Sequence, residues 1–292
     1  MHNSVIPRRP YNAEVDLSIL GFGGIILMGQ EQAAANREVA RAVDRGVNYF
    51  DVAPVYGKGE AEEKLGPALA PYRDDIFLAC KTHFRSAERA KASLENSLRV
   101  LQTDHFDLFQ FHNLSEEAEV EEVFGPGGAM EVVQEAQRAG KIRHIGFSCH
   151  REDTALDLLD RFDWDSVLFP LNVVCMINGD FGNRLLAKAK EKNVTRLALK
   201  ALAHTPWENA KVKEAAASKC WYRPVEDDEL ADLALRYTLS LDVTSAVAPG
   251  DEFIYRMAEE RVSDFKPLAA NEEVRLRELI RGMEPIFSNL NK

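Results

Sequence analysis

Four residues that can move or stabilise a proton follow apolar segments of the chain: Asp51, Tyr56, Lys81 and His112. A tyrosine hydroxyl has an ordinary pKa of about 10, so it exchanges protons poorly at neutral pH until its surroundings lower that value. The ammonium of Lys81 would favour the phenolate, and the carboxylate of Asp51 would hold that ammonium in place. With His112 orienting a substrate oxygen, the set can deliver a proton to a carbonyl. No side chain donates hydride, so carbonyl reduction here also needs a nicotinamide cofactor.

Each of these residues also has a structural explanation. An aspartate or lysine at a strand end is commonly half of an ion pair, and a histidine there is commonly a hydrogen-bonded residue of the rim. Lys200 is a further residue of this kind, at the end of the apolar segment 197–200. The functional explanation is favoured for the set, because side chains at the ends of successive barrel strands converge on one mouth.

The elements that must position these residues are alternating strands and helices. Continuous apolar runs predict strands whose two faces are both covered by other elements, and segments with apolar residues at helical spacing follow them. About eight such units in a chain of 292 residues favour a (β/α)8 TIM barrel of the α/β class, while an open doubly wound sheet stays an alternative. The predicted strands are 21–27, 47–53, 76–82, 106–112, 142–149, 166–173, 195–202 and 244–248. The predicted helices include 60–69, 130–139, 153–162, 181–192, 228–241 and 254–262, and residues 14–20 suggest a short hairpin.

No linker or break in composition divides the chain, so one domain is expected over residues 1–292, with a core at about 15–262 and a helical tail at 263–292. The net charge of −11 argues against a nucleic-acid surface. No apolar run approaches the roughly 20 residues of a membrane span, and residues 1–10 lack a signal-peptide core. A cytoplasmic protein is therefore expected. Its four scattered cysteines predict reduced thiols, neither disulfides nor a metal site: Cys80, Cys149, Cys175 and Cys220.

The motifs that carry these residues resemble those of the aldo-keto reductases, a (β/α)8-barrel family that uses nicotinamide cofactors without a Rossmann domain. The matching segments are NYFDVAPVYG at 48–57, GEAE at 59–62, ACKT at 79–82, DLFQFH at 107–112 and GKIRHIGFS at 140–148. The similarity runs from about residue 15 to 262. It implies NAD(P)H-dependent reduction of a small aldehyde or ketone, or the reverse. It further implies Tyr56 as general acid, Lys81 and Asp51 as its tuning pair, and His112 as the group that orients the carbonyl.

The resemblance also implies a cofactor site, with several departures from the family pattern. Ser148 matches a family serine that holds the nicotinamide carboxamide, but Cys149 stands where asparagine is usual and Leu168 where glutamine is frequent. Lys200 replaces an aromatic residue that stacks on the nicotinamide, and it acts either electrostatically or in a structural pair. The predicted cofactor-binding residues are Gly24, Asp51, Ser148, Cys149, Lys200, Ala201, Leu202, Gly250, Asp251, Arg256, Glu259 and Glu260.

At the adenosine end, Arg256 matches the family arginine that reaches the adenine and the 2′-phosphate, and Glu259 matches an acidic adenine contact. Glu260 replaces an asparagine, Gly250 a basic residue, and Asp251 a hydroxyl residue. A carboxylate near a 2′-phosphate is repulsive. Arg256 nevertheless makes NADP the preferred cofactor, with NAD as the alternative.

The loops that would shape a substrate pocket are modest. Residues 112–128 are acidic and predict a solvated surface, whereas residues 203–226 carry aromatic and histidine side chains that either wall the pocket or cover the barrel: His204, Trp207, Trp221 and Tyr222. An open site for small carbonyl substrates is expected.

Two other functions fit the same residues. A barrel lyase or aldolase would use Lys81 or Lys200 as a Schiff-base nucleophile, which borohydride trapping would reveal. A cofactor-binding regulatory subunit or sensor would bind cofactor with little turnover, and the departures at Cys149 and Leu168 leave room for it. The sequence specifies neither the substrate, the reaction direction nor the oligomeric state.

Overall fold

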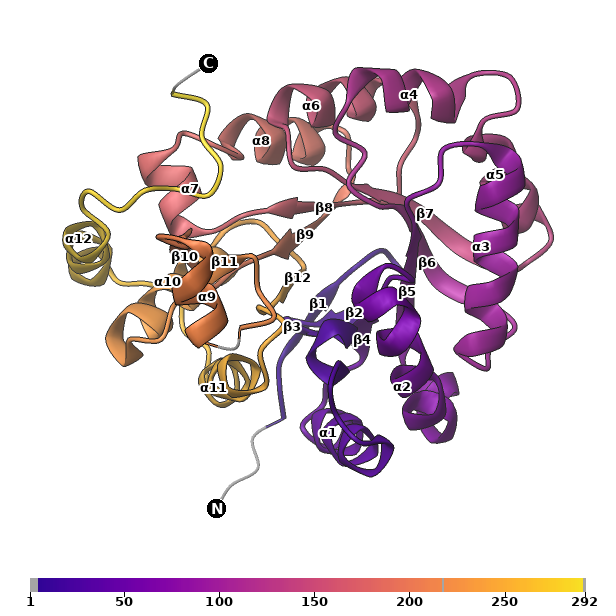
Figure 1. The fold of residues 1–292 in the computed structure, drawn as a ribbon. Coiled ribbons are helices and arrows are strands. Elements are labelled where there is room, and N and C mark those ends of the chain that lie inside the picture. Colours follow the sequence, from indigo (N-terminus) through magenta and orange to yellow (C-terminus); the bar gives the residue numbers. More distant parts are fainter. Residues whose placement is uncertain (1–4, 217, 291–292) are drawn as a thin grey trace.

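Eight parallel strands close into a barrel in the order β12-β3-β4-β5-β6-β7-β8-β9 (Figure 1). The structure is a computed structural model that describes residues 5–216 and 218–290. Because β12 pairs with both β9 and β3, the sheet has no free edge, and the open-sheet alternative is wrong. The barrel strands are β3 (Leu20–Gly23), β4 (Tyr49–Asp51), β5 (Phe77–Thr82), β6 (Phe106–Phe111), β7 (Ile142–Ser148), β8 (Ser166–Pro170), β9 (Thr195–Leu199) and β12 (Ser245–Val247).

Helices surround the barrel, as Figure 1 shows, and each turns an apolar face towards the strands. In α5, for example, Met130, Val133 and Ala136 recur at helical spacing and are buried. The outer helices are α1 (Gln32–Asp44), α2 (Glu60–Leu69), α3 (Ala87–Val100), α5 (Ala129–Arg138), α6 (Glu152–Arg161), α8 (Asn183–Glu191), α10 (Asp228–Ser240) and α11 (Glu252–Val262).

Successive strand residues point to opposite sides of the barrel wall. In β4, Tyr49 belongs to a small apolar cluster with residues of the other strands, whereas Phe50 packs in the large cluster that includes helix residues. This alternation explains why the strands are continuous apolar runs, since both faces are covered. We call the small set the inner cluster; its buried members are Tyr11, Leu17, Tyr49, Phe77, Ala79, Leu108, Leu168, Leu197 and Val247.

An antiparallel hairpin lies at the N-terminal end of the barrel. It pairs β1 (Arg8–Pro10) with β2 (Asp16–Ser18), so the predicted hairpin exists but its first strand begins earlier than residue 14. Tyr11 at its turn packs against Phe77, the first residue of β5, at 4.9 Å between ring centroids. The hairpin therefore covers the end of the barrel opposite to the strand ends that carry the candidate residues.

Several predicted boundaries were wrong for local reasons. The predicted strand 166–173 ends at Pro170, because the Asn172 side chain accepts a hydrogen bond from the Cys175 backbone and caps α7 (Val173–Asn178). The predicted strand 21–27 ends at Gly23, where η1 (Gly24–Leu27) begins. The acidic region 112–128 contains a helix, α4 (Glu117–Phe124), which buries Val120 and Val123 and exposes Glu117, Glu121 and Glu122.

The remaining elements cover the C-terminal end of the barrel and its flank. Residues 203–226 form a second hairpin of β10 (Ala203–Pro206) and β11 (Tyr222–Pro224) with α9 (Ala210–Ala215) between them. Three parts of the expected domain lie outside the described residues: residue 217 of this region, residues 1–4 and residues 291–292. In the described chain no helix is long and apolar enough to cross a membrane.

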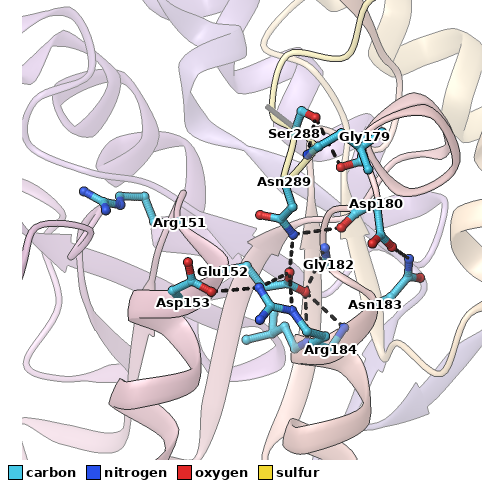
Figure 2. Close-up of polar contacts among 12 residues, drawn as sticks. Arg151, Glu152, Asp153, Gly179, Asp180, Gly182, Asn183, Arg184, Ser288 and Asn289 are labelled. Carbon is cyan, nitrogen blue, oxygen red and sulfur yellow. Dashed lines mark hydrogen bonds and ion pairs between the residues drawn. The ribbon is translucent and has the colours of Figure 1, made fainter. Parts of the chain in front are cut away.

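The tail contains α12 (Ala270–Leu279) and then continues as an irregular segment that passes α7 and α8 (Figure 1). Its end is attached by side-chain and backbone bonds, which Figure 2 shows. The Asn289 amide donates to the buried carboxylate of Glu152 and, at 2.8 Å, to the backbone oxygen of Asp180, while its backbone N–H donates to Gly179 at 2.8 Å. The exposed Arg184 also pairs with Glu152, so the tail joins an existing ion pair whose carboxylate is buried.

Candidate functional site

Asp51 and Lys81 end adjacent strands and form a buried ion pair. Asp51 is the last residue of β4 and Lys81 lies near the end of β5, and each is at most 3% exposed. The Lys81 amine donates to Asp51 Oδ1 and, at 3.3 Å, to the backbone oxygen of Val52. A buried ion of either sign would be costly alone, so each charge requires the other.

The second oxygen of Asp51 is also occupied. Gln110 Nε2 donates to Asp51 Oδ2 at 3.0 Å, and the Tyr49 hydroxyl donates to the same atom at 3.3 Å. Burial lowers the pKa of Lys81, but Asp51 and other neighbours raise it by more, so the ammonium stays charged. Gln110 and Tyr49 were not predicted from the sequence. Their position two residues from His112 and Asp51, on the same strand faces, is the signal that would have identified them.

Tyr56 lies on a tight loop between β4 and α2. In η2 (Tyr56–Gly59), Gly57, Lys58 and Gly59 all have positive φ, at 61°, 57° and 103°. Glycine adopts this conformation without the steric cost that a side chain incurs, so the two glycines permit the sharp turn. The Lys81 amine lies 5.3 Å from the centroid of the Tyr56 ring, and the His112 ring lies edge-on at 5.6 Å. The structure thus brings all four predicted residues together.

The protonation states in this group follow from burial and from Lys81. Burial raises the pKa of Tyr56, and Lys81 opposes that effect without outweighing it, so the hydroxyl is protonated at neutral pH. Lys81 therefore lowers the pKa of the phenol, as predicted, but burial raises it by more. Burial, with Lys81 and Lys200, holds the pKa of His112 well below its usual range, so its imidazole is neutral. The arrangement combines a protonated hydroxyl, a fixed ammonium and a neutral hydrogen-bonding ring.

A cavity of about 270 Å³ opens at this mouth of the barrel. Besides the four residues above, three predicted cofactor residues line it: Ser148, Lys200 and Gly250. Leu168, Trp221 and Tyr222 line it too, whereas His204 and Trp207 do not. Apolar side chains such as Leu199 and Val247 form part of the wall beside the polar group, a mixture typical of ligand sites.

The other predicted cofactor residues do not line this cavity. Gly24 lies in η1 beside Val52, and its neighbours Gly23 and Ile25 form the wall instead. The Cys149 thiol is buried, donates to the Arg151 backbone oxygen at 3.1 Å and lies 3.5 Å from the Ser115 hydroxyl. Two other predicted cofactor residues, Ala201 and Leu202, are buried. The last four are on or next to α11: Asp251, Arg256, Glu259 and Glu260. All four cysteines are free thiols, as expected.

At the nicotinamide end of the predicted cofactor site, Ser148 already forms hydrogen bonds with the protein backbone. The Ser148 hydroxyl accepts the backbone N–H of Asn113 at 2.7 Å. It donates its own proton to the backbone oxygen of Phe111 at 3.5 Å and keeps a second lone pair for further bonding. Ser148 is thus able to hold an amide, while the Cys149 side chain points to other partners.

The predicted adenosine end is a network of charges between α1 and α11. The guanidinium of Arg256 pairs with Glu38 and, at 2.7 Å, with Glu252. Glu259 is buried and pairs with Arg41. Asp251 caps α11 by accepting the Ile254 N–H at 3.1 Å, and Glu260 is exposed. The positive charge expected to meet a 2′-phosphate is therefore already flanked by two carboxylates.

His150 is a cavity residue that the sequence analysis missed. It lies two residues after the end of β7, and its Nε2 lies 3.0 Å from the amine of Lys200. Burial lowers its pKa to about 2, so the ring is neutral. A search for every polar residue that follows a strand would have included it.

Comparison with known proteins identifies relatives along the barrel. The model of the family described as "Aldo/keto reductase family" matches residues 20–260. The aldo-keto reductase YhdN of Bacillus subtilis is 31% identical over 201 residues, which span 63% of this chain but only 57% of that protein. The match to the oxidoreductase YqkF of the same organism likewise spans only 56% of that protein. L-galactose dehydrogenase of Arabidopsis thaliana is 26% identical over 303 residues, covering 94% of this chain and 93% of that enzyme.

Solved structures show the same fold. The holo form of the aldo-keto reductase AKR11C1 from Bacillus halodurans superposes with a TM-score of 0.73 at 23% identity, covering 96% of this chain and 98% of that one. The thermostable aldo-keto reductase Tm1743, solved with the inhibitor epalrestat, gives 0.69 at 22% identity, covering 94% and 100%. At these identities the likeness establishes the barrel fold.

Proposed function

Because the chain belongs to the aldo/keto reductase family, whose members are NAD(P)-dependent oxidoreductases of carbonyl compounds, we propose that it reduces a small aldehyde or ketone to an alcohol, or catalyses the reverse. The observation that carries this proposal is the buried Lys81–Asp51 pair beside Tyr56, in a cavity that His112 also lines. Proton delivery to a carbonyl oxygen needs a protonated hydroxyl whose conjugate base is stabilised, and this group provides both.

In the proposed mechanism, Tyr56 gives its hydroxyl proton to the carbonyl oxygen. The phenolate that forms lies beside the Lys81 ammonium, whose charge favours it. Asp51 holds that ammonium, and Gln110 holds the carboxylate. The neutral His112 ring orients the carbonyl oxygen by a hydrogen bond. A bound nicotinamide supplies the hydride, and Ser148 would hold its carboxamide.

The preference for NADP stays a prediction, and it depends on Arg256. The ion pairs of Arg256 with Glu38 and Glu252 argue against a preference for NADP. A 2′-phosphate would have to share the guanidinium with two carboxylates. NAD carries a hydroxyl at this position and meets no such repulsion.

A regulatory subunit or sensor is the second candidate function. The observation that favours it is the Cys149 thiol, which is bound to the Arg151 backbone and Ser115 where the family has an amide for the cofactor. Such a protein would bind cofactor and release it slowly, with negligible steady-state turnover.

Turnover and binding assays on Tyr56→Phe test the proposed reductase. The wild-type protein should oxidise NADPH or NADH in the presence of reactive aldehydes. The substitution should lower that rate by about 10²- to 10⁴-fold, because it removes the transferable proton. Cofactor affinity, measured by fluorescence titration, should stay unchanged. Tyr237→Phe removes the same atom from α10, outside the cavity, and serves as the control.

Two results would contradict the proposal. The first is no turnover of any aldehyde or ketone in a broad panel. The second is an undiminished rate in Tyr56→Phe. Slow cofactor release without turnover would instead support the sensor.

A further inference from the structure

We propose that Lys200 and His150 form an anion-binding subsite of the cavity, which selects carbonyl substrates that carry a carboxylate. The inference rests on the proposed function and names the substrate class of that site. Lys200 and His150 line the same cavity as Tyr56 and His112, so both pairs face one space for a ligand.

The backbone holds Lys200 in an uncommon conformation at the end of β9. Its φ is 61°, in the left-handed region that side chains rarely adopt. This conformation ends the predicted strand 195–202 at Leu199 and leaves the Lys200 amine among the atoms that line the cavity. Strain of this kind is tolerated where a side chain must be aimed at a site.

Lys200 has no ion-pair partner within the described residues, although the more distant charge of Asp51 also raises its pKa. No carboxylate there lies within ion-pair distance of its amine, unlike Lys81, which has Asp51. The thiols of Cys175 and Cys220 interact with it, but burial raises the pKa of both thiols and keeps them neutral. As a result, burial lowers the pKa of Lys200 to about 7. A bound carboxylate would restore the missing charge.

The geometry around the amine leaves donors for a ligand. An ammonium has three N–H donors. The neutral ring of His150 accepts one of them through Nε2, at 3.0 Å. Two donors therefore remain for the two oxygens of a carboxylate, and charge-assisted bonds of this kind are the stronger ones.

Aromatic side chains surround this subsite. The Lys200 amine lies 5.8 Å from the centre of the Trp221 ring, which is 50% exposed at the mouth. The Phe287 ring lies 5.7 Å from Trp221 and 5.1 Å from His150. Phe287 is held there by the attachments of the following tail residues in Figure 2. These apolar rings suit the carbon body of a small organic acid and strengthen the ionic contact by limiting water.

The anion would lie close to the reacting carbonyl. Lys200 lowers the pKa of both His112 and His150, so the subsite and the carbonyl-orienting ring are within electrostatic reach. This proximity favours a carboxylate on a short substrate. A phosphate of the cofactor is the other source of an anion, and the experiment separates the two.

The first test compares 3-formylbenzoate with 3-formylbenzamide, two aldehydes of nearly equal size that differ in charge. The wild-type protein should favour the acid by about tenfold or more in kcat/KM, which corresponds to about 1.4 kcal/mol. Lys200→Met should abolish this preference while the amide is still reduced, and Lys200→Arg should keep it. Lys266→Met, an exposed lysine in the tail, should behave like wild type.

The pH dependence distinguishes ligand binding from a structural role. In the wild type, KM for the acid should rise as pH increases above about 7, because Lys200 loses its proton there. KM for the amide should not follow this curve. In Lys200→Arg the rise should be absent, since a guanidinium stays charged.

Equilibrium binding keeps this inference separate from the reductase itself. Calorimetry with 3-(hydroxymethyl)benzoate and its amide, on wild type and Lys200→Met with and without NADPH, measures the subsite without any turnover. If neither aldehyde is reduced, the proposed function fails, and binding still decides the subsite. Equal affinities of acid and amide in the wild type would overturn the inference.

Two further results would also overturn it. If Lys200→Met weakens NADPH binding and leaves the acid-to-amide ratio unchanged, Lys200 serves a cofactor phosphate. If borohydride fixes an aldehyde onto Lys200, as judged by peptide mass, the amine is a nucleophile.

Discussion

At the scale of single residues, the chemistry depends on a carboxylate that has almost no contact with solvent. Asp51 is 3% exposed and accepts hydrogen bonds from Lys81, Gln110 and Tyr49. Only one of these donors is charged. The Lys81–Asp51 pair is therefore balanced in charge, and removal of the Lys81 ammonium alone leaves a buried anion.

We predict that Lys81→Met destabilises the fold as well as the reaction. Its free energy of unfolding should fall by about 3–5 kcal/mol, because Asp51 would remain buried and unpaired. The double variant Asp51→Asn with Lys81→Met should recover part of the loss, although it should be equally inactive. Urea denaturation of the two variants and of Asp51→Asn alone gives the coupling energy. Equal stabilities of Lys81→Met and wild type would contradict the burial argument.

The sequence was sufficient to predict the four residues of the proposed chemistry as one group, because each follows or ends a strand in a fold that directs strand ends to one mouth. It was not sufficient for the contact between Lys200 and His150. That contact depends on the left-handed backbone at Lys200 and on the side-chain conformation of both residues. Neither is specified by the spacing of apolar residues.

At the scale of elements, helix α11 contributes both an arginine and one of the two acids that pair with it. Arg256 and Glu252 are one helical turn apart and pair at 2.7 Å, and Glu38 of α1 reaches the same guanidinium. The resemblance implied a cofactor role for residues of this helix, but it gave no information on the ion pairs with α1. Those pairs form between segments far apart in the sequence.

We predict that Glu252→Gln increases the preference for NADPH over NADH by about two- to fivefold. Removal of one of the two carboxylates leaves more of the Arg256 charge for a 2′-phosphate, and a partly exposed pair of this kind contributes up to about 1 kcal/mol. Fluorescence titration with both cofactors measures the ratio. Glu260→Gln changes the net charge of the same helix equally but lies at an exposed position. The same shift in both variants would indicate a general charge effect and contradict a specific role of Glu252.

Element boundaries were the weaker part of the sequence analysis. Strands were predicted too long at their C-terminal ends, where Asn172 caps a helix and Lys200 turns the chain. Helix α4 was taken for a solvated loop because its glutamates outnumber its two buried valines. In each instance a local feature overrides the apolar pattern, whereas the number and order of the strands follow from that pattern.

At the scale of the whole molecule, two neutral histidines make stability dependent on pH. Burial lowers the pKa of His112 well below 6.5, and that of His150 to about 2. In the unfolded chain both rings gain protons as pH falls through about 6.5, and in the folded protein they do not. Acid therefore favours unfolding, and the stability present above about pH 6.5 is lost as pH falls below it.

We predict that the free energy of unfolding in urea decreases between about pH 7 and 5.5. The double variant His112→Gln with His150→Gln should show a flatter dependence over this interval, because it lacks both groups. His105→Gln, which changes a histidine outside the cavity, should keep the wild-type slope. A slope that is unchanged in the double variant would contradict the assignment.

The attachment of the tail affects the order in which parts of the structure form during synthesis. Synthesis proceeds from the N-terminus, so every strand of the barrel leaves the ribosome before Phe287 does. A nascent chain that ends after α11 already has pairing partners for all of these strands, but it lacks the ring that packs on His150 and Trp221. The barrel can thus form first. The ring of Phe287, which packs behind His150 and Trp221, is added only by residues that are translated near the end.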